Sequence, residues 1–342
     1  MVILEYPEIC TVVINHNGET YLRKCFGSIV SQDYPEDKKR IMVVDNSSED
    51  GSIDFIEKNY ANVEVIESGG KLGYAGGANV GYRRAGGKYV ILMANDVILP
   101  KNWTKNMVEL MENREDVAAA TTVMINGETT NAGLGDVVNA SPVLVGKSDA
   151  SDSNYTVVPW GGACIVRKDL FDVPFDADYF LYGEDVYLGL LSWLKGFKVV
   201  VGRMNVAHLG SVTVGFSSYT QVYYNERNRL TNLLLFFKRE TILMLSPLIV
   251  FDIIIRFLYF LRTNRLDLVK AEGSAILWNI KNIRKNLKKR LVIQSARKVD
   301  DCITLDVLCE KLYGKGGLKD FINVFATSYF RLIKRVCRRF RI

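Results

Sequence analysis

Residues 40–51 read Arg-Ile-Met-Val-Val-Asp-Asn-Ser-Ser-Glu-Asp-Gly. The short apolar run is typical of a buried strand, and it ends at Asp45, where a polar turn begins. This turn caps a helix that we expect to continue to about Tyr60. Similar runs predict further strands at residues 9–14, 63–66 and 88–93. Because helical patterns separate these strands, the sequence predicts an α/β fold with a mostly parallel sheet and helices on both faces.

The chain after this first sheet pattern is less regular. Residues 126–157 are rich in Gly, Ser, Asn and Asp, so we expect an irregular segment or short strands there. Beyond them, the apolar spacing predicts a strand at 163–166, a helix at 184–195, a strand at 198–201 and a long helix at 218–238.

The composition is that of an ordinary globular protein. The 342 residues are 48% hydrophobic and 24% charged, which excludes a disordered chain, a collagen-like fibre and a small disulfide scaffold. The six cysteines form no Cys-x-x-Cys pair, and with only two histidines they do not make a structural zinc site. We expect buried thiols in a reducing compartment, and the first ten residues lack the pattern of a signal peptide.

Positive charge is concentrated near the C-terminus. Residues 281–342 contain 17 Lys and Arg against 5 Asp and Glu, a net charge of +12. Since the whole chain carries +6, residues 1–280 sum to −6. A basic tail on an acidic body predicts contact with an anionic surface. Because no recognised nucleic-acid-binding module accompanies the basic run, we expect lipid and no nucleic acid.

Residues 242–261 are mostly apolar and long enough to cross a bilayer as a helix. Pro247, Asp252 and Arg256 interrupt them, and the two charges, spaced i, i+4, would be costly at the centre of a span. We favour an amphipathic region that lies in the membrane plane or re-enters it; a true span and a buried helix are the alternatives. The predicted domains are residues 1–235 and a helical, basic, membrane-associating region of residues 236–342.

Polar residues follow the predicted strands at their carboxyl ends, which is where open α/β sheets bind ligands. Asn15 follows the first strand, Asp45 the second, and Asn95-Asp96 the fourth. The Asp45 carboxylate could accept from a ribose or a base, or it could equally cap the next helix. Asp96 is a candidate ligand of Mg²⁺ or Mn²⁺, with a turn role before Pro100 as the alternative.

Other segments offer further signals. The glycine-rich residues 71–81 open a helix and could bring backbone N–H groups close to a diphosphate, although they match no nucleotide fingerprint, so this signal is weak. Glu184 and Asp185 at the start of a helix are a stronger signal. Repulsion between adjacent acids raises the pKa of one of them, as a general base requires; the alternative is acid placement that suits the helix dipole. His208 is a candidate ligand or a structural residue. Trp160-Gly161-Gly162 could form an aromatic surface on which a sugar packs; a core Trp before a turn is the alternative.

Four segments, taken in order, carry a resemblance to a known family. They are residues 11–18 with Ser28 and Gln32; residues 43–48 with Gly51-Ser52; residues 73–81 followed by Asn95-Asp96; and residues 161–164 with 180–185 and 208–211. Over about residues 8–230 the chain resembles the family-2 inverting glycosyltransferases of the A-type fold, especially the branch that includes rhamnosyltransferases.

The resemblance implies a role for each matched residue. Asp96 would bind a Mg²⁺ or Mn²⁺ ion on the donor diphosphate, with His208 as a further ligand. Asp185 matches the base that deprotonates the acceptor hydroxyl, and Glu184 is its neighbour. The donor nucleotide-sugar would be contacted by Asn15, His16, Asp45, Gly73, Asn79 and Asn95. The acceptor would be contacted by Trp160, Gly161 and Gly162.

Three positions depart from the family pattern. Ala94 stands where the metal motif often has Asp or Asn, and Tyr187 and Leu191 replace an Asp and an Arg that commonly follow the acidic pair. The expected activity is transfer of a sugar from a UDP- or dTDP-sugar to a glycan or lipid-linked acceptor, with inversion, at the cytoplasmic face of the cell membrane. A non-catalytic nucleotide-sugar or glycan-binding relative is the alternative. A nicotinamide-dependent oxidoreductase is disfavoured, because no dinucleotide fingerprint follows the first strand.

Overall fold

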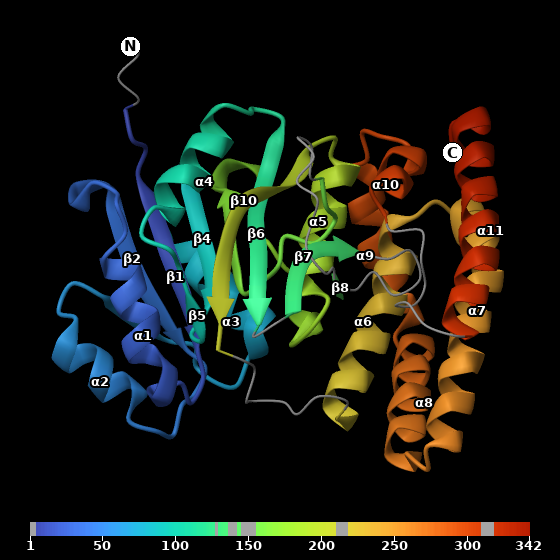
Figure 1. Ribbon diagram of the computed structural model, residues 1–342, viewed down its shortest axis with the longest axis horizontal. Coiled ribbons are helices and arrows are strands. Elements are labelled where there is room, and N and C mark those ends of the chain that lie inside the picture. The colour runs from blue at the N-terminus through green and yellow to red at the C-terminus, as the bar shows by residue number, and fades with distance from the viewer. Residues whose placement is uncertain (1–4, 127–128, 136–141, 145–154, 210–217, 309–317) are drawn as a thin grey trace.

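The computed structural model describes residues 5–126, 129–135, 142–144, 155–209, 218–308 and 318–342. One sheet forms its centre, in the order β3-β2-β1-β4-β9-β6-β10-β5, with β7 and β8 extending from β6 (Figure 1). The strands are β1 Ile9–Asn15, β2 Lys39–Asp45, β3 Glu64–Glu67, β4 Tyr89–Ala94, β5 Val97–Ile98, β6 Val117–Asn126, β7 Thr129–Gly135, β8 Pro142–Leu144, β9 Ala163–Arg167 and β10 Lys198–His208.

The N-terminal half of the sheet is parallel. β1 pairs in parallel with both β2 and β4, and β2 with β3, so that the carboxyl ends of these strands meet at one edge. β9 runs antiparallel between β4 and β6, whereas β6 and β10 are again parallel. Every residue of β1 is buried, because each face of the strand is covered by helices.

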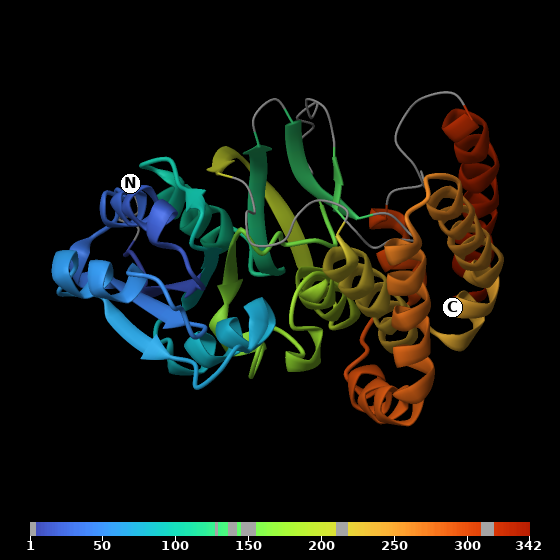
Figure 2. The ribbon, with the colours of Figure 1, turned by 90° about the horizontal axis from the view of Figure 1, so that it is seen from below.

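Helices cover both faces of the sheet (Figure 2). Side chains of α1, α2 and α4 pack into one hydrophobic core, and those of α3 and α5 into the other, together with the C-terminal helices. The helices are α1 Glu19–Val30, α2 Ser52–Asn59, α3 Gly73–Arg84, α4 Trp103–Glu112, α5 Glu184–Leu194, α6 Tyr219–Phe236, α7 Arg239–Arg262, α8 Leu266–Lys281, α9 Ile283–Ser295, α10 Asp301–Val307 and α11 Leu318–Phe340. This architecture confirms the predicted α/β class and the helical C-terminal region.

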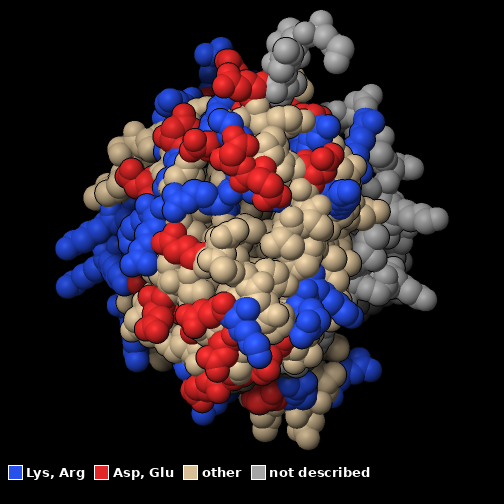
Figure 3. Space-filling model, turned by 90° about the vertical axis from the view of Figure 1, so that its left-hand side faces the viewer, with Lys and Arg blue, Asp and Glu red and all other residues tan. Residues whose placement is uncertain are grey.

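The C-terminal helices stand on one side of the sheet, with α7 and α11 side by side at the far edge (Figures 1 and 2). α6 joins this bundle to the α/β part, since it packs against α5 on one side and against α8 and α9 on the other. The opposite end of the molecule, around α1 and α2, carries interspersed positive and negative side chains (Figure 3). The division at residue 235 stays a prediction, and it falls inside α6.

A buried ion cluster holds α6, α7 and α8 together. Arg256 Nη2 lies 2.6 Å from Glu226, 3.2 Å from Asp252 and 2.8 Å from Glu272. Arg229 Nη2 lies 2.6 Å from Glu226 as well. All three carboxylates are at most 1% exposed, so their charges face the interior of the helical bundle. Asp252 and Arg256, which are spaced i, i+4 in the sequence, thus form an ion pair within a larger cluster.

Several predicted elements differ in detail. β6 was not predicted, and β10 continues beyond the expected strand as far as His208. α7 is unbroken despite Pro247, which cannot donate to the carbonyl oxygen of Leu243 four residues earlier. The Ser246 hydroxyl donates to that oxygen at 2.8 Å instead, which lets the helix continue. Cysteines 10, 25, 164 and 337 are buried as expected, Cys302 is partly exposed, and Cys309 lies outside the described residues.

Candidate active site

Polar side chains from three neighbouring strands meet at the carboxyl edge of the sheet. In the strand register Asn15 lies opposite Asp45, and Ala94, opposite Ile14, immediately precedes Asn95. The Asn15 side-chain amide donates to Asp45 Oδ1 at 3.0 Å, and Asn95 Nδ2 donates to Asn15 Oδ1 at 2.8 Å. The predicted convergence of Asn15, Asp45 and Asn95 is thus present, while their contact with a donor stays a prediction.

Asp45 shapes the turn after β2. Its Oδ2 accepts from the backbone N–H of Ser48 at 2.9 Å, which closes a side-chain turn within residues 45–48. The alternative role as a helix cap is wrong, because α2 is preceded by Gly51 and begins at Ser52. The buried Asp45 carboxylate therefore fixes the loop between β2 and α2 at the edge where a nucleoside is expected.

Asp96 and His208 face each other across the sheet edge. β5 pairs antiparallel with the end of β10, which sets His208 opposite Val97 and brings its Nε2 to 3.1 Å from Asp96 Oδ2. Asp96 Oδ1 and His208 Nδ1 are buried and have no hydrogen-bond partner among the described residues. An oxygen and an imidazole nitrogen of this kind suit a divalent cation that completes its shell with phosphate oxygens and water.

The chemistry of this pair fits a divalent ion, but the pair is small. The described residues contain no group of three or more His, Cys, Asp or Glu that could hold a metal. Ala94, at the end of β4, offers no side-chain ligand at the position where the resemblance implies an Asp or Asn.

The turn at residues 160–162 lies between this pair and the acidic helix. The ring of Trp160 meets the ring of His208 edge-on, with centroids 5.3 Å apart. Gly162 O accepts from the backbone N–H of Ala94 at 3.0 Å, which ties the turn to β4. The backbone N–H of Gly161 donates to the Asp185 carboxylate. Gly162 has no room for a side chain, because a Cβ there would fall within 2.2 Å of the Trp160 ring.

Glu184 and Asp185 are both buried at the first turn of α5. Burial raises the pKa of the Asp185 carboxyl to about 6, although hydrogen bonds from the backbone N–H groups of Val186 and Gly161 act in the opposite direction. Burial and the neighbouring Asp185 charge raise the pKa of Glu184 further still. The pair therefore has the property required of a general base near neutral pH.

The loop that carries this pair has an unusual backbone. Phe180, Tyr182 and Gly183 all have positive φ, at 61°, 62° and 75°, which costs free energy at the two non-glycine residues. α6 holds these residues in place: Asn228 Nδ2 donates to the carbonyl oxygens of Tyr179, Leu181 and Tyr182, and Asn232 Nδ2 donates to that of Gly183 at 3.2 Å.

Arg227 completes this contact between α6 and the loop by donating to the carbonyl oxygens of Asp178 and Tyr179. We call Arg227, Asn228 and Asn232 the α6 clamp. Sequence reasoning missed it, and the only available signal was a pair of amide side chains spaced i, i+4 in a predicted helix.

The glycine-rich segment begins α3 as expected and touches the same loop. Gly73 has a φ of +68°, and a Cβ there would lie 2.2 Å from the carbonyl oxygen of Phe180. The side-chain amide of Asn79 is hydrogen-bonded to the backbone: its Nδ2 donates to Phe175 O at 2.7 Å and its Oδ1 accepts from Phe175 N at 3.2 Å. These bonds give Asn79 a structural role, and its expected donor contact stays a prediction. His16 is half-buried after β1, with Nδ1 unbonded among the described residues.

The two family departures on α5 are explained by packing. Tyr187 meets Tyr179 and Phe236 edge-on, with ring centroids 5.4 and 5.0 Å apart, and Leu191 packs on the same hydrophobic core. Tyr187 therefore links α5 to Phe236 of α6, and Leu191 contributes to the hydrophobic core.

Residues 10–175 match the protein family described as glycosyl transferase family 2. This part of the chain, just under half of it, is thus similar to a glycosyl transferase family 2 domain. It is 25% identical over 207 residues, 56% of this chain and 63% of the relative, to the dolichyl N-acetyl-alpha-D-glucosaminyl phosphate 3-beta-D-2,3-diacetamido-2,3-dideoxy-beta-D-glucuronosyltransferase of Methanococcus voltae. It is 27% identical over 108 residues, 30% of this chain and 22% of the relative, to the beta-monoglucosyldiacylglycerol synthase of Synechocystis sp.. The chain thus spans less than two thirds of the length of these curated relatives.

Solved structures confirm the predicted A-type fold. The mannosyltransferase PcManGT of Pyrobaculum calidifontis, in complex with GDP-Man and Mn²⁺, superposes with a TM-score of 0.53 at 13% identity, covering 98% of this chain and 87% of that one. Residues 1–349 of TarS of S. aureus, in complex with UDP-GlcNAc, give 0.54 at 16% identity, covering 97% and 92%. Both likenesses extend over the helical C-terminal region.

Proposed function

We propose that this protein is an inverting glycosyltransferase that moves a sugar from a UDP- or dTDP-sugar to a hydroxyl group of a glycan or lipid-linked acceptor. The similarity of residues 10–175 to family 2 supports the reaction class. A structural neighbour in complex with UDP-GlcNAc and another with GDP-Man and Mn²⁺ support a nucleotide-sugar donor and a divalent ion. The order of the sequence motifs, which resembles the rhamnosyltransferase branch, makes dTDP-hexoses a donor class to test beside UDP-sugars.

One observation carries the proposal: a single turn connects the expected base to the expected donor site. Trp160 packs on His208, which lies 3.1 Å from Asp96, while Gly161 donates to Asp185. A donor diphosphate at Asp96 and an acceptor hydroxyl at Asp185 would therefore lie on opposite sides of residues 160–162. An acceptor and a leaving group on opposite faces of the donor sugar give inversion.

The Asp185 carboxylate would accept the proton of the acceptor hydroxyl, whose oxygen bonds to the anomeric carbon as the bond to the diphosphate breaks. The products are the inverted glycoside, the nucleoside diphosphate and a protonated Asp185. Asp96 and His208 would hold the divalent ion, which as a Lewis acid neutralises charge on the leaving diphosphate. Since Tyr187 and Leu191 serve packing, their identity does not favour the non-catalytic alternative.

Asp185→Asn tests the assignment. We expect loss of sugar transfer with donor binding within about twofold of wild type, because the amide fills the same space without a basic oxygen. Asp169→Asn, at an exposed aspartate, is the matched control and should retain transfer. Full activity of Asp185→Asn would reject the base assignment, and no transfer or donor hydrolysis by wild type would favour the non-catalytic relative.

We further propose that the C-terminal region lies on the cytoplasmic face of a membrane. α7 is long and apolar enough to cross one, with a mean hydropathy of 2.1 over an 18-residue stretch. Its outward side chains Ile254, Leu258 and Leu261 are 51%, 57% and 52% exposed, whereas Asp252 is fully buried in the ion cluster. Because α7 is tied to α6 and α8 by buried charges, this supports contact along one helix face. Co-sedimentation with anionic vesicles tests this membrane contact. We expect wild type to sediment with the vesicles and the double variant Ile254→Asp/Leu258→Asp to sediment less.

A further inference from the structure

Tyr74, the second residue of α3, is fastened to the 160–162 turn of the candidate active site. Its hydroxyl donates a hydrogen bond to the carbonyl oxygen of Gly161, 87 positions later in the chain. The ring lies against the same residue, since a Cβ added to Gly161 would fall 3.3 Å from Tyr74 Cε1. The ring also contacts Phe175, with centroids 6.1 Å apart. Both the ring and the hydroxyl of Tyr74 therefore restrict the position of Gly161.

Gly161 connects Tyr74 to the acidic pair. Its backbone N–H donates to the Asp185 carboxylate, while its carbonyl oxygen accepts from Tyr74. Glycine has the widest choice of backbone conformations of any residue, so hydrogen bonds from other segments decide how Gly161 is oriented. The carbonyl oxygen of Gly162 accepts from the N–H of Ala94 at 3.0 Å. The Tyr74 hydroxyl thus fixes the preceding peptide group, between Gly161 and Gly162, from the side of α3.

The Tyr74 hydroxyl stays protonated at neutral pH, so it remains a donor. Burial raises the pKa of the Tyr74 phenol well above its ordinary value, and nearby acidic groups act in the same direction. These groups are, in order of effect, Cys164 on β9, Glu184 and Asp185 on α5, and Asp96 after β4. Burial also raises the pKa of the Cys164 thiol, which therefore stays neutral as well. The hydrogen bond from Tyr74 to Gly161 is thus retained while Asp185 titrates.

We propose that Tyr74 is a positioning residue for sugar transfer, because it holds Gly161 so that the Gly161 N–H points at the Asp185 carboxylate. This role rests on the proposed function, in which Asp185 is the base. A hydrogen bond to an ionised carboxylate favours the ionised form and fixes the direction of its oxygens. Tyr74 also follows Gly73, an expected donor contact, so the same link connects the donor side of the site to the base.

Tyr74→Phe tests this role, since it keeps the ring and removes the hydroxyl. In protein labelled with ¹³C at the aspartate carboxyl groups, the NMR signal that is absent from Asp185→Asn identifies Asp185. We expect this signal to titrate at a higher pH in Tyr74→Phe than in wild type, because a weakened Gly161 hydrogen bond stabilises the ionised carboxylate less. At pH 8, kcat should fall about 5- to 20-fold, with the KM for the donor within about twofold of wild type.

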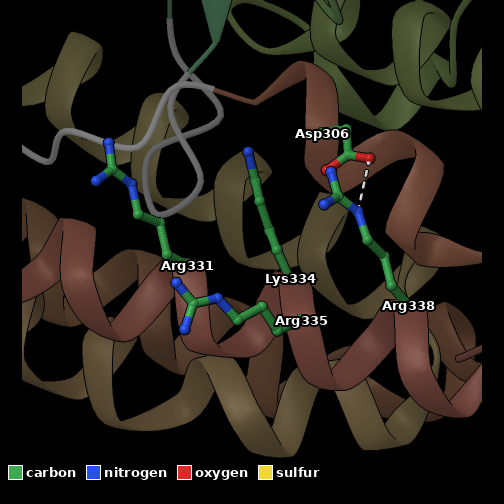
Figure 4. Close-up of a pocket in the computed structure, with 5 residues that line it drawn as sticks. All are labelled: Asp306, Arg331, Lys334, Arg335 and Arg338. Atoms are coloured by element: carbon green, nitrogen blue, oxygen red, sulfur yellow. Dashed lines mark hydrogen bonds and ion pairs between the residues drawn. The ribbon is translucent and has the colours of Figure 1, made fainter.

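Tyr82→Phe is the matched control. Tyr82 is fully buried on the same helix, and its hydroxyl donates to Lys168 O at 3.2 Å, just after β9, whereas the turn precedes this strand. Arg338→Gln is a second control, because it breaks the exposed ion pair of 2.7 Å between Arg338 and Asp306, which joins α11 to α10 (Figure 4). Both controls should keep the Asp185 titration and the kcat of wild type.

A higher titration midpoint and a lower kcat in Tyr74→Phe, with neither change in the controls, would support the positioning role. The same midpoint as in wild type, an unchanged kcat, or an equal change in Tyr82→Phe would overturn it. The NMR titration needs no substrate, so it separates this role from the proposed function. A raised midpoint without any transfer by wild type would support the link from Tyr74 to Asp185 and reject sugar transfer. Transfer by wild type with an unaltered midpoint in Tyr74→Phe would reject the role of Tyr74 alone.

Discussion

The side-chain amide of Asn228 donates a hydrogen bond to the carbonyl oxygen of Tyr182, two residues before Glu184. Tyr182 has a φ of +62°, a conformation that a tyrosine does not retain without support. The same amide also holds Leu181 O at 2.9 Å, so one residue of α6 fixes two consecutive peptide groups. The position of the acidic pair thus depends on a helix residue that lies 46 positions after Tyr182 in the chain.

Asn228→Ala should lower kcat about 10- to 100-fold, because a displaced base loses its alignment with the acceptor hydroxyl. The affinity for the donor should stay within about twofold of wild type, since Asn228 does not reach the sheet edge where Asn15 and Asp45 lie. Steady-state kinetics together with calorimetry of the nucleotide would separate these two effects. Asn225→Ala, on the same helix, is the control. An unchanged kcat would show that the loop keeps its shape without the α6 clamp.

The fall in activity on the acidic side of the pH–activity profile should reflect protonation of Asp185. Its folded-state pKa is raised to about 6, and the base must be deprotonated to act, so kcat/KM should fall as the pH drops through about 6. Initial rates between pH 5 and pH 8 at saturating Mn²⁺ provide the measurement. A limb near pH 4, the range of an ordinary aspartate, would contradict the buried position of this carboxyl.

Glu184→Gln should stabilise the protein above acidic pH. The pKa of Glu184 is raised in the folded state from 4.5 to about 8, so its contribution to stability is fully present below 4.5 and is lost as the pH rises to about 8. The variant should gain about 1–3 kcal/mol of unfolding free energy over wild type at pH 8, and little at pH 4.5, in urea titrations. Glu57→Gln, at an exposed glutamate, should show no such pH-dependent gain. Equal stability of Glu184→Gln and wild type at both pH values would argue that Glu184 is not desolvated.

Binding of UDP or dTDP should depend on Mn²⁺ through Asp96. Calorimetry should show nucleotide affinity that rises with Mn²⁺ in wild type and falls at least tenfold in Asp96→Ala, because the variant removes a buried oxygen that has no hydrogen-bond partner among the described residues and is available to a cation. His208→Ala should show a smaller loss in the same direction. A metal response that Asp96→Ala leaves intact would place the ion elsewhere.

Arg256→Met should cost about 3–5 kcal/mol of unfolding free energy, because it leaves the carboxylates of Glu226, Asp252 and Glu272 buried without their shared partner. Denaturant titration measures the loss. Arg262→Met, which removes an exposed arginine of the same helix, should change stability by less than about 0.5 kcal/mol. A loss below about 1 kcal/mol for Arg256→Met would mean that the cluster is hydrated.

The alternation of strands and helices made the parallel part of the sheet predictable, since both the apolar runs and the polar residues at their ends are local signals. The meeting of Asn15 with Asp45 followed from the same rule about strand ends. The pairing of Asp96 with His208 needed an antiparallel return of β10 past β5, which no local pattern encodes. Both residues were predicted as metal ligands only because the order of the motifs resembles a glycosyltransferase family.

The parts that the sequence did not predict depend on contacts between distant segments. Asn228 sits in a helix whose spacing looks ordinary, and only the folded chain brings it to the carbonyl groups before Glu184. Tyr187 and Leu191 stand where the resembling family commonly has an Asp and an Arg, whereas in the structure Tyr187 contacts Phe236 of α6 and Leu191 packs on the hydrophobic core. β6 was missed because its run of small residues, Ala118-Ala119-Ala120, is as compatible with a helix as with a strand.

Two residues of α6 that are two positions apart contact different neighbours: Glu226 enters the ion cluster with α7 and α8, while Asn228 reaches the loop before α5. This has a consequence for protein engineering. A chimaera that exchanges the α/β part at residue 235 would leave buried arginine and carboxylate side chains facing a foreign bundle. Recombination between relatives should instead place its crossover after α8, so that donor specificity is transplanted together with the helices that support it.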